Sequence, residues 1–322
     1  MKLIFSLTLI LISFFSQAQT AGSGNYPNRP IKIIVPFAAG GVTDVLARII
    51  GNEISKDLGQ PVIVENVTGV SGVIGSQQLA RSAPDGYTLM INSNVHTINP
   101  AIRKTLPYDT IKDFTPLILL GNAPNMLIVN ANAPAKTLAE YIALAKQKPG
   151  EITYATSGVG TSLHIAGAQF SQITGTSFNH IPYAASNQSI QAVVAGHTFS
   201  SWSAVNSALP FIKDGRVRAI AVASDVRTTF APDIPTFNEL GVKGMKSETW
   251  LGAFAPANTP SAITILLANK MKQILFRPGI KDKILGIGAD PNGLELDKFS
   301  ILIKEEIEMY KQIVTLGGIK AE

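Results

Sequence analysis

The chain has 322 residues, of which 46% are hydrophobic and 15% charged, with no cysteine and a formal net charge of +5. This composition is typical of a globular protein and excludes disorder, a collagen-like repeat, a disulfide scaffold and a cysteine-ligated metal. The length suggests about two domains. Lys and Arg are scattered singly rather than in runs with aromatic residues, so we expect no nucleic-acid partner.

The N-terminal segment has the form of a secretory signal. Lys2 precedes the apolar run Leu3 to Phe15, and Ser16-Gln17-Ala18 follows as a small-residue cleavage site. The apolar run is shorter than the roughly 20 residues that a membrane-spanning helix needs. We therefore expect the protein to be exported, the signal segment 1–18 to be removed by cleavage near Ala18, and the soluble mature chain to begin near Gln19. A retained membrane anchor is the alternative.

Apolar strands alternate with amphipathic helices along the mature chain. Before residue 150, we predict strands at 31–37, 61–65, 87–91, 117–120 and 126–129, and helices at 42–58, 75–81 and 138–146. After Pro149-Gly150 the order restarts, with strands at 152–155, 180–183, 198–201 and 217–223 and helices at 162–173 and 189–195. The last part has one strand at 251–255 and helices at 263–276 and 299–314.

This alternation predicts an α/β fold of two doubly wound domains, whose parallel sheets bind ligands beyond the carboxyl ends of the strands. The last segment cannot easily form a domain alone, so we expect it to return to the first one. Domain 1 then comprises residues 19–124 plus 250–322, and domain 2 residues 125–249. Chain crossings near 122–130 and 248–256 form a hinge with two crossings.

A pair of glycines lies between a predicted strand and a predicted helix in the segment Pro36 to Asp44. Gly40 and Gly41 let the main chain come close to a ligand, and the free N–H groups and dipole at the helix start favour a carboxylate or phosphate. Alternatively, the glycines only make the turn while Thr43 or Asp44 caps the helix. The two interpretations are compatible.

A second segment, Thr156 to His164, has the same order of strand, small polar loop and helix. It fits neither the phosphate-binding loop nor the dinucleotide fingerprint. Its hydroxyls and amides are typical of a neutral anion clamp. If it faces the first loop from the other domain, the two loops form a two-jawed anion site.

Catalytic and metal-binding patterns are absent from the sequence. It has no Gly-x-Ser-x-Gly motif, and its four histidines are widely separated and not paired with carboxylates at helical spacing. We therefore expect no metal and no cofactor. His164 is either a packed structural histidine or a base. Tyr183 and Trp202 lie near strand ends, where an aromatic ring belongs either to the core or to the wall of a small-molecule pocket.

A series of short motifs occurs in a specific order and spacing over nearly the whole mature chain. They are Tyr26-Pro27-Asn28-Arg29-Pro30-Ile31, Val35-Pro36-Phe37-Ala38-Ala39-Gly40-Gly41 with Asp44, Val64-Glu65-Asn66, Pro84-Asp85-Gly86-Tyr87-Thr88-Leu89, Lys112-Asp113-Phe114, Lys148-Pro149-Gly150, Ser157-Gly158 with Gly160 and His164, Pro182-Tyr183, Pro232-Asp233-Ile234-Pro235-Thr236, and Ala255-Pro256 with Thr259-Pro260. Together they resemble the periplasmic substrate-binding proteins of tripartite tricarboxylate transporters, the Bug family.

The resemblance implies a type II-like periplasmic binding protein clamshell that closes on a small carboxylate and delivers it to the membrane permease subunits of such a transporter. It also implies a periplasmic monomer with no enzymatic activity. The ligand-binding positions that it implies are Phe37, Ala38, Ala39, Gly40, Gly41, Thr43, Asp44, Ser93, Asn94, Ser157, Gly160, Thr161, His164, Tyr183, Ala184 and Ser203.

The sequence departs from the family pattern where the far end of the ligand would lie. Many members have Lys-Gly where this chain has Ala184-Ala185, and acidic residues where it has Phe199 and Ser201-Trp202-Ser203. We therefore expect a less charged distal wall. The solute would then have one well-held carboxylate and an apolar, aromatic or hydroxylated remainder, because the ammonium of an amino acid needs an acidic partner.

Two other functions are consistent with the same sequence. A binding protein of this fold can report its ligand to a sensor kinase instead of a permease. An exported hydrolase or isomerase would need a residue of shifted acidity in the cleft, for which His164 and Asp44 are the candidates.

Overall fold

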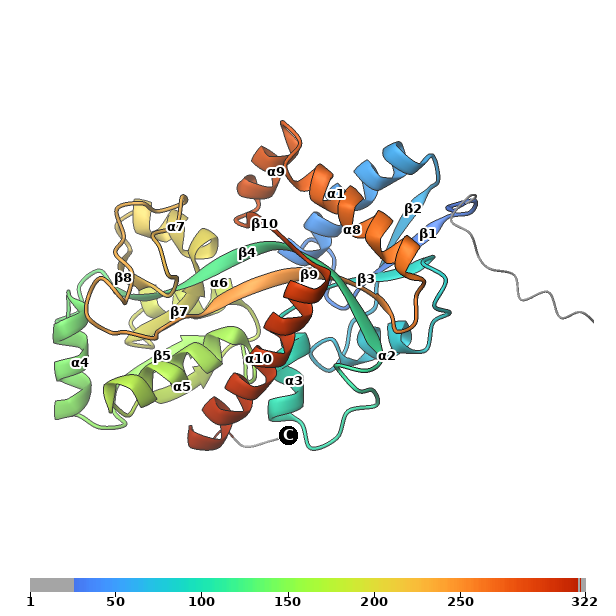
Figure 1. The fold of residues 1–322 in the computed structure, drawn as a ribbon. Helices are drawn as coiled ribbons and strands as arrows, with labels where there is room; N and C mark the ends of the chain where they lie inside the picture. The colour runs from blue at the N-terminus through green and yellow to red at the C-terminus, as the bar shows by residue number, and fades with distance from the viewer. Residues whose placement is uncertain (1–25, 318, 320–322) are drawn as a thin grey trace, which may run out of the picture.

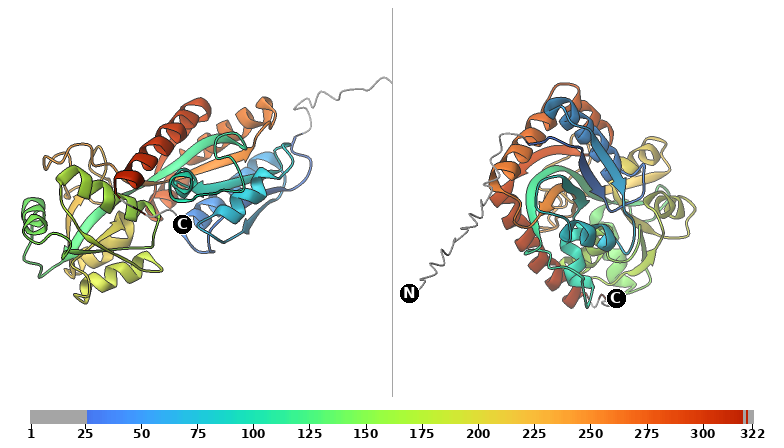
Figure 2. Two further views of the ribbon diagram at one scale, coloured as in Figure 1. Left: turned by 90° about the horizontal axis from the view of Figure 1, so that it is seen from below. Right: turned by 90° about the vertical axis from the view of Figure 1, so that its right-hand side faces the viewer.

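The computed structural model describes residues 26–317 and 319. The predicted signal segment, residues 1–18, lies outside the described residues. The chain forms two lobes, each a sheet with helices on both faces (Figure 1). Figure 2 shows the lobes at opposite ends of an elongated molecule.

The first lobe contains the sheet β2-β1-β3-β9-β4, with β10 added on β4. The strands are β1 (Ile31–Val35), β2 (Val62–Asn66), β3 (Thr88–Ser93), β4 (Phe114–Asn130), β9 (Glu248–Pro256) and β10 (Asp290–Glu295). Its helices are α1 (Val42–Leu58), α2 (Val73–Ala80), α3 (Val95–Ile102), α8 (Ser261–Leu275) and α9 (Ile280–Gly286). Helices α1 and α8 pack on one face, and α2 and the C-terminal helix α10 (Leu296–Leu316) on the other.

The second lobe is built on the other half of β4, which pairs with β7 and β8. Its further strands are β5 (Thr153–Thr156), β6 (Asn179–Pro182), β7 (Ser200–Ala204) and β8 (Val217–Val222). Its helices are α4 (Leu138–Gln147), α5 (Ser162–Thr174), α6 (Ser186–Val194) and α7 (Val205–Lys213). Helices α4 and α5 cover one face, and α6 and α7 the other.

Strand β9 pairs antiparallel over its full length with the first part of β4, up to Pro124, and β4 continues from there into the second lobe (Figure 1). The first half of β4 pairs with β10, and its second half, from Asn125, with β7. The sheets are therefore mixed, whereas the alternation of strands and helices predicted parallel ones. Strand β1 pairs in parallel with β2 and β3, and β5 pairs in parallel with β6 and β7, as expected.

Helix α10 packs against both lobes. Its C-terminal half contributes Tyr310, Ile313 and Val314 to an apolar cluster with α3 and α5. One turn before Tyr310, the Glu306 carboxylate accepts hydrogen bonds from Thr97 Oγ1 (2.8 Å) and Trp250 Nε1 (2.7 Å). These bonds fix α10 to α3 and β9 at the junction of the lobes.

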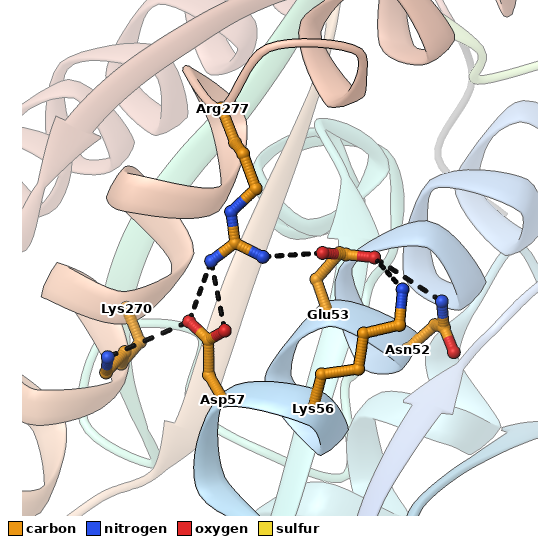
Figure 3. Close-up of polar contacts among 6 residues, drawn as sticks. All are labelled: Asn52, Glu53, Lys56, Asp57, Lys270 and Arg277. Atoms are coloured by element: carbon orange, nitrogen blue, oxygen red, sulfur yellow. Dashed lines mark hydrogen bonds and ion pairs between the residues drawn. The ribbon is translucent and has the colours of Figure 1, made fainter.

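An ion-pair network joins the N-terminal and C-terminal parts of the first lobe (Figure 3). Arg277, just after α8, pairs with Glu53 and Asp57 of α1, and its Nη2 lies 2.9 Å from Asp57 Oδ2. Lys56 and Lys270 complete the network from α1 and α8. Because the carboxylate of Glu53 is nearly buried, the Arg277 guanidinium offsets its cost of desolvation.

Most predicted elements form within a few residues of their predicted bounds, with two differences. The predicted strands at 117–120 and 126–129 are parts of one long strand, β4. The sequence analysis did not predict helices α3, α7 and α9, nor strand β10. The helices within residues 26–317 and 319 are all too short or too polar to span a membrane.

Candidate functional site

A cavity of about 330 Å³ lies between the two lobes. It is lined by Phe37, Val42, Thr43, Ser93, Asn94, Val95, Ala123, Asn125, Ser157, Thr161, Ser162, Leu163, Ser186, Ala204, Asn206, Ser207, Thr249 and Leu251. Among these described lining residues there is no Asp, Glu, Lys, Arg or His. The cavity thus offers hydroxyl, amide and apolar groups without a formal charge.

Helices from both lobes begin at this cavity. Lining residues occupy the first turn or N-cap of α1 and α3 in the first lobe and of α5, α6 and α7 in the second. Each helix N-terminus carries a partial positive charge and unpaired N–H groups. Their convergence creates an electrostatic environment that favours an anion without any cationic side chain.

The start of α1 leaves backbone donors free. Its N-cap residue is Gly41, and no side chain caps the helix there. The N–H of Val45 donates to Gly41 O, whereas the N–H groups of Val42 and Thr43 have no acceptor among the described residues. Both residues line the cavity, so these N–H groups can donate to a bound anion.

Asp44 holds the first loop from behind the cavity. Its buried carboxylate accepts hydrogen bonds from Gly40 N–H (2.9 Å), Arg48 Nε (3.1 Å) and Asn66 Nδ2 (2.9 Å). Burial raises the pKa of Asp44, but the hydrogen bonds from Arg48, Gly40 and Asn66 outweigh it and lower the pKa to about 2. The carboxylate fixes the loop and already occupies the Gly40 amide.

The second loop is closed by its own hydrogen bonds. Thr161 caps α5, because its Oγ1 accepts from His164 N–H (3.3 Å) and donates to Gly158 O (2.9 Å). The Gly160 N–H donates to His164 Nδ1 at 3.1 Å. The amides of Ser162 and Leu163, which precede the capped one, remain without an acceptor among the described residues.

His164 lies outside the cavity lining. Its ring stacks on His180 with centroids 3.9 Å apart, and burial lowers its pKa to about 4. The two rings line a separate depression beside Tyr154 and Phe178, which the end of α10 at Leu316 also lines. Of the two interpretations of His164, this geometry favours a packed, neutral structural histidine.

The predicted distal positions Ser201 and Ser203 form a small buried hydroxyl cluster and do not line the cavity. Ser203 is buried, and its Oγ lies 3.0 Å from Ser201 Oγ. Trp202 is 1% exposed and packs against Phe170 and Phe237, so it belongs to the core rather than to a pocket wall.

The structure places the predicted site residues in two groups. The cavity lining contains Phe37, Thr43, Ser93, Asn94, Ser157 and Thr161. The following lie outside it: Ala38, Ala39, Gly40, Gly41, Asp44, Gly160, His164, Tyr183, Ala184 and Ser203. A direct role for the second group stays a prediction.

Several lining residues were not predicted, above all Ser186, Asn206 and Ser207 at the starts of α6 and α7. A signal for the α7 residues does exist in the sequence. The segment Ser203-Ala204-Val205-Asn206-Ser207 is mostly small and polar and leads from the end of strand β7 directly into helix α7. This is the same order as in the two loops that the sequence analysis did identify.

Comparison with known proteins identifies the family. Residues 46–319 match the family model described as "Tripartite tricarboxylate transporter family receptor". The chain belongs to this receptor family. The resemblance to Bug proteins is therefore confirmed, and with it the clamshell fold of periplasmic solute-binding proteins.

Individual relatives resemble the chain over nearly its full length. Protein BugT of Bordetella pertussis is 32% identical over 313 residues, which cover 97% of this chain and 96% of BugT. The structure of R. palustris Rpa4515 with adipate is 30% identical, with a TM-score of 0.80 and coverage of 92% and 99%. MatC from Rhodopseudomonas palustris with bound malate is 29% identical, with a TM-score of 0.75 and coverage of 90% and 100%.

Proposed function

We propose that the chain is an exported receptor that captures a small carboxylate between its lobes and delivers it to the membrane permease of a tripartite tricarboxylate transporter. The observation that carries this proposal is the convergence of α1 and α3 from one lobe and α5, α6 and α7 from the other on one uncharged cavity. A carboxylate accepts hydrogen bonds from such N–H groups and is stabilised by the helix dipoles.

The lining also indicates which carboxylates bind. An ammonium group in this cavity would lose its hydration without meeting an acidic side chain among the described lining residues. We therefore propose a carboxylate with an apolar or hydroxylated remainder and no ammonium. Adipate and malate, which are named with the two solved relatives, carry no ammonium, although each has a second carboxylate in addition to the one proposed here, and they are the first solutes to test.

We further propose that the lobes are the two domains of the clamshell and that they move about β4 and β9. In support, β4 changes partners between Asn122, which pairs with β10, and Asn125, which pairs with β7. We propose the domain boundaries at 124/125 and 249/250, as predicted from the sequence, and the partner change of β4 supports the first of them. The mature chain would begin at Gln19 and act as a periplasmic monomer, which intact-mass analysis and light scattering of the exported protein test directly.

Introducing an aspartate side chain at the start of α6 tests the proposed anion site. Ser186 is the first residue of α6 and lines the cavity, and Ser261 is the first residue of α8, far from it. Both Ser186→Asp and Ser261→Asp place a negative charge at a helix N-terminus. Only Ser186→Asp places it beside a bound anion, so calorimetry should show malate or adipate binding weakened by at least about tenfold.

The matched Ser261→Asp variant should bind these acids like the wild-type protein. Unchanged binding in Ser186→Asp would contradict the location of the site. If both variants lose binding, the effect is not local, and circular dichroism would then show whether the fold has changed.

A further inference from the structure

One side chain of the cavity also touches the opposite lobe. Asn206, the second residue of α7, lines the cavity, and its Nδ2 donates a hydrogen bond to Ile287 O at 3.1 Å. Ile287 follows α9 in the first lobe, whereas α7 belongs to the second. Asn206 therefore connects the ligand cavity with a contact between the lobes.

The backbone next to Ile287 is shaped for this contact. Gly288 is buried, has φ +82°, and lies so close to α7 that a Cβ added to it would be 2.2 Å from Asn206 Cβ. Only glycine permits both the positive φ and this approach. The lobes can thus come together here only because residue 288 has no side chain.

The side-chain amide of Asn206 can bond to a ligand and to the Ile287 carbonyl at the same time. The Ile287 carbonyl can only accept, so the Asn206 amide must present its NH₂ group to it. That group has a second N–H, for which the described residues supply no acceptor. A carboxylate in the cavity is such an acceptor, and it favours the amide orientation that the contact needs.

We propose that Asn206 couples ligand binding to closure of the lobes, by donating one N–H to the bound anion and the other to Ile287 O. This inference rests on the proposed carboxylate site and assigns a positioning role within it. A neighbouring bond, from Thr229 Oγ1 to Asp290 Oδ1 (3.0 Å), also crosses between the lobes. Thr229 does not line the cavity, so it provides a comparison for a contact without a ligand.

The test combines affinity with the separation of the lobes. Because the chain has no cysteine, spin labels can be placed on Lys213→Cys and Lys283→Cys, at exposed positions in α7 and α9, and their separation measured by pulsed electron paramagnetic resonance. Malate and adipate are the probes. The test variants are Asn206→Ala and Gly288→Ala, and the latter changes no lining residue.

Two controls isolate the contact. Gly279→Ala introduces the same backbone strain, because Gly279 has φ +76°, but its added Cβ meets nothing within 4 Å. Thr229→Val removes the hydrogen bond to Asp290, which joins the lobes but involves no residue of the cavity lining. We expect both test variants to weaken binding by about tenfold and to keep a population at the longer label separation, and both controls to stay within about threefold of wild type.

The outcomes separate this inference from the proposed function. If wild type binds and closes, but Asn206→Ala and Gly288→Ala have its affinity and label separations, the coupling role is overturned while the carboxylate site stands. If wild type binds neither acid, the proposed function fails. The role of the contact is then judged from the label separations of the ligand-free proteins. A longer separation in Gly288→Ala than in wild type and Gly279→Ala would then support it, and equal separations would overturn it.

Discussion

The buried imidazole of His96 predicts a specific loss of stability at mildly acidic pH. His96 lies in α3, is fully buried among the rings of Tyr108, Phe114 and Phe254, and neither ring nitrogen makes a well-formed hydrogen bond. Burial lowers its pKa from 6.5 to about 3, and a backbone contact with Thr110 offsets this only in part. The folded protein therefore excludes a proton that the unfolded chain takes up below pH 6.5.

The magnitude follows from this difference in proton binding. An imidazole that has an unfolded pKa of about 6.5 and stays neutral when folded lowers the unfolding free energy by about 2 kcal/mol between pH 7 and pH 5. His164, with its pKa lowered by burial to about 4, acts in the same direction. Glu306 acts in the opposite direction, because burial raises its pKa to about 7 and its protonated form stabilises the fold as the pH falls.

Because these effects overlap, the test compares a variant with the wild type at both pH values. His96→Leu removes the imidazole and keeps a helix-forming, apolar residue. In urea unfolding, the stability of His96→Leu relative to wild type should rise by about 2 kcal/mol between pH 7 and pH 5. Any difference in packing is common to both pH values and cancels. His197→Gln, at an exposed turn, controls for the loss of one imidazole.

An identical pH dependence in His96→Leu and wild type would refute this reasoning. It would mean that His96 takes up a proton in the folded state, and therefore that water or a hydrogen-bond acceptor reaches the ring.

Three further predictions concern ion pairs and close packing in the first lobe. Arg277→Ala should lower the thermal midpoint in calorimetry, because the nearly buried Glu53 carboxylate loses one of its cationic partners; an unchanged midpoint would contradict this. Gly252→Ala should cost about 1–3 kcal/mol in urea unfolding, since the added Cβ would lie 2.4 Å from Phe299 Cζ, and a neutral effect would contradict the close packing of α10 on β9. Asp44→Asn should be less stable than wild type at pH 7, and because the pKa of Asp44 is lowered to about 2, the difference should shrink as the pH falls from 4 towards 2; a constant difference would argue against the charge as its source.

The elements with regular apolar periodicity were predictable from the sequence. Helix α1 begins and ends at the predicted residues, because its apolar side chains recur at three and four residue steps and Gly59 ends it with a positive φ. The first loop could be found for the same reason, since a buried strand, a glycine pair and a helix follow each other directly. Local sequence determines these features, so the single chain suffices to predict them.

Features that depend on distant partners could not be predicted. Helices α3 and α7 are short, and each contains a proline, Pro100 or Pro210, which cannot donate to the preceding turn. Strand β4 contains Pro116, Gly121 and Pro124, which interrupt its pattern, and pairing with β9 through local register shifts keeps it continuous. The predicted site lacked the α7 residues because helix α7, with Pro210 inside it, was not predicted, and the strand-to-helix signal at 203–207 was therefore missed.

The central claim is the capture of a carboxylate that carries no ammonium, and one titration tests it most directly. The chain from residue 19 onward, freed of ligand by unfolding and refolding, is titrated in a calorimeter with succinate, malate and aspartate. These acids share two carboxylates and differ only in hydrogen, hydroxyl or ammonium at one carbon. We predict saturable binding of malate or succinate and binding of aspartate weaker by at least about tenfold. Aspartate bound as tightly as malate, or no binding of any of the three or of adipate, would contradict the account.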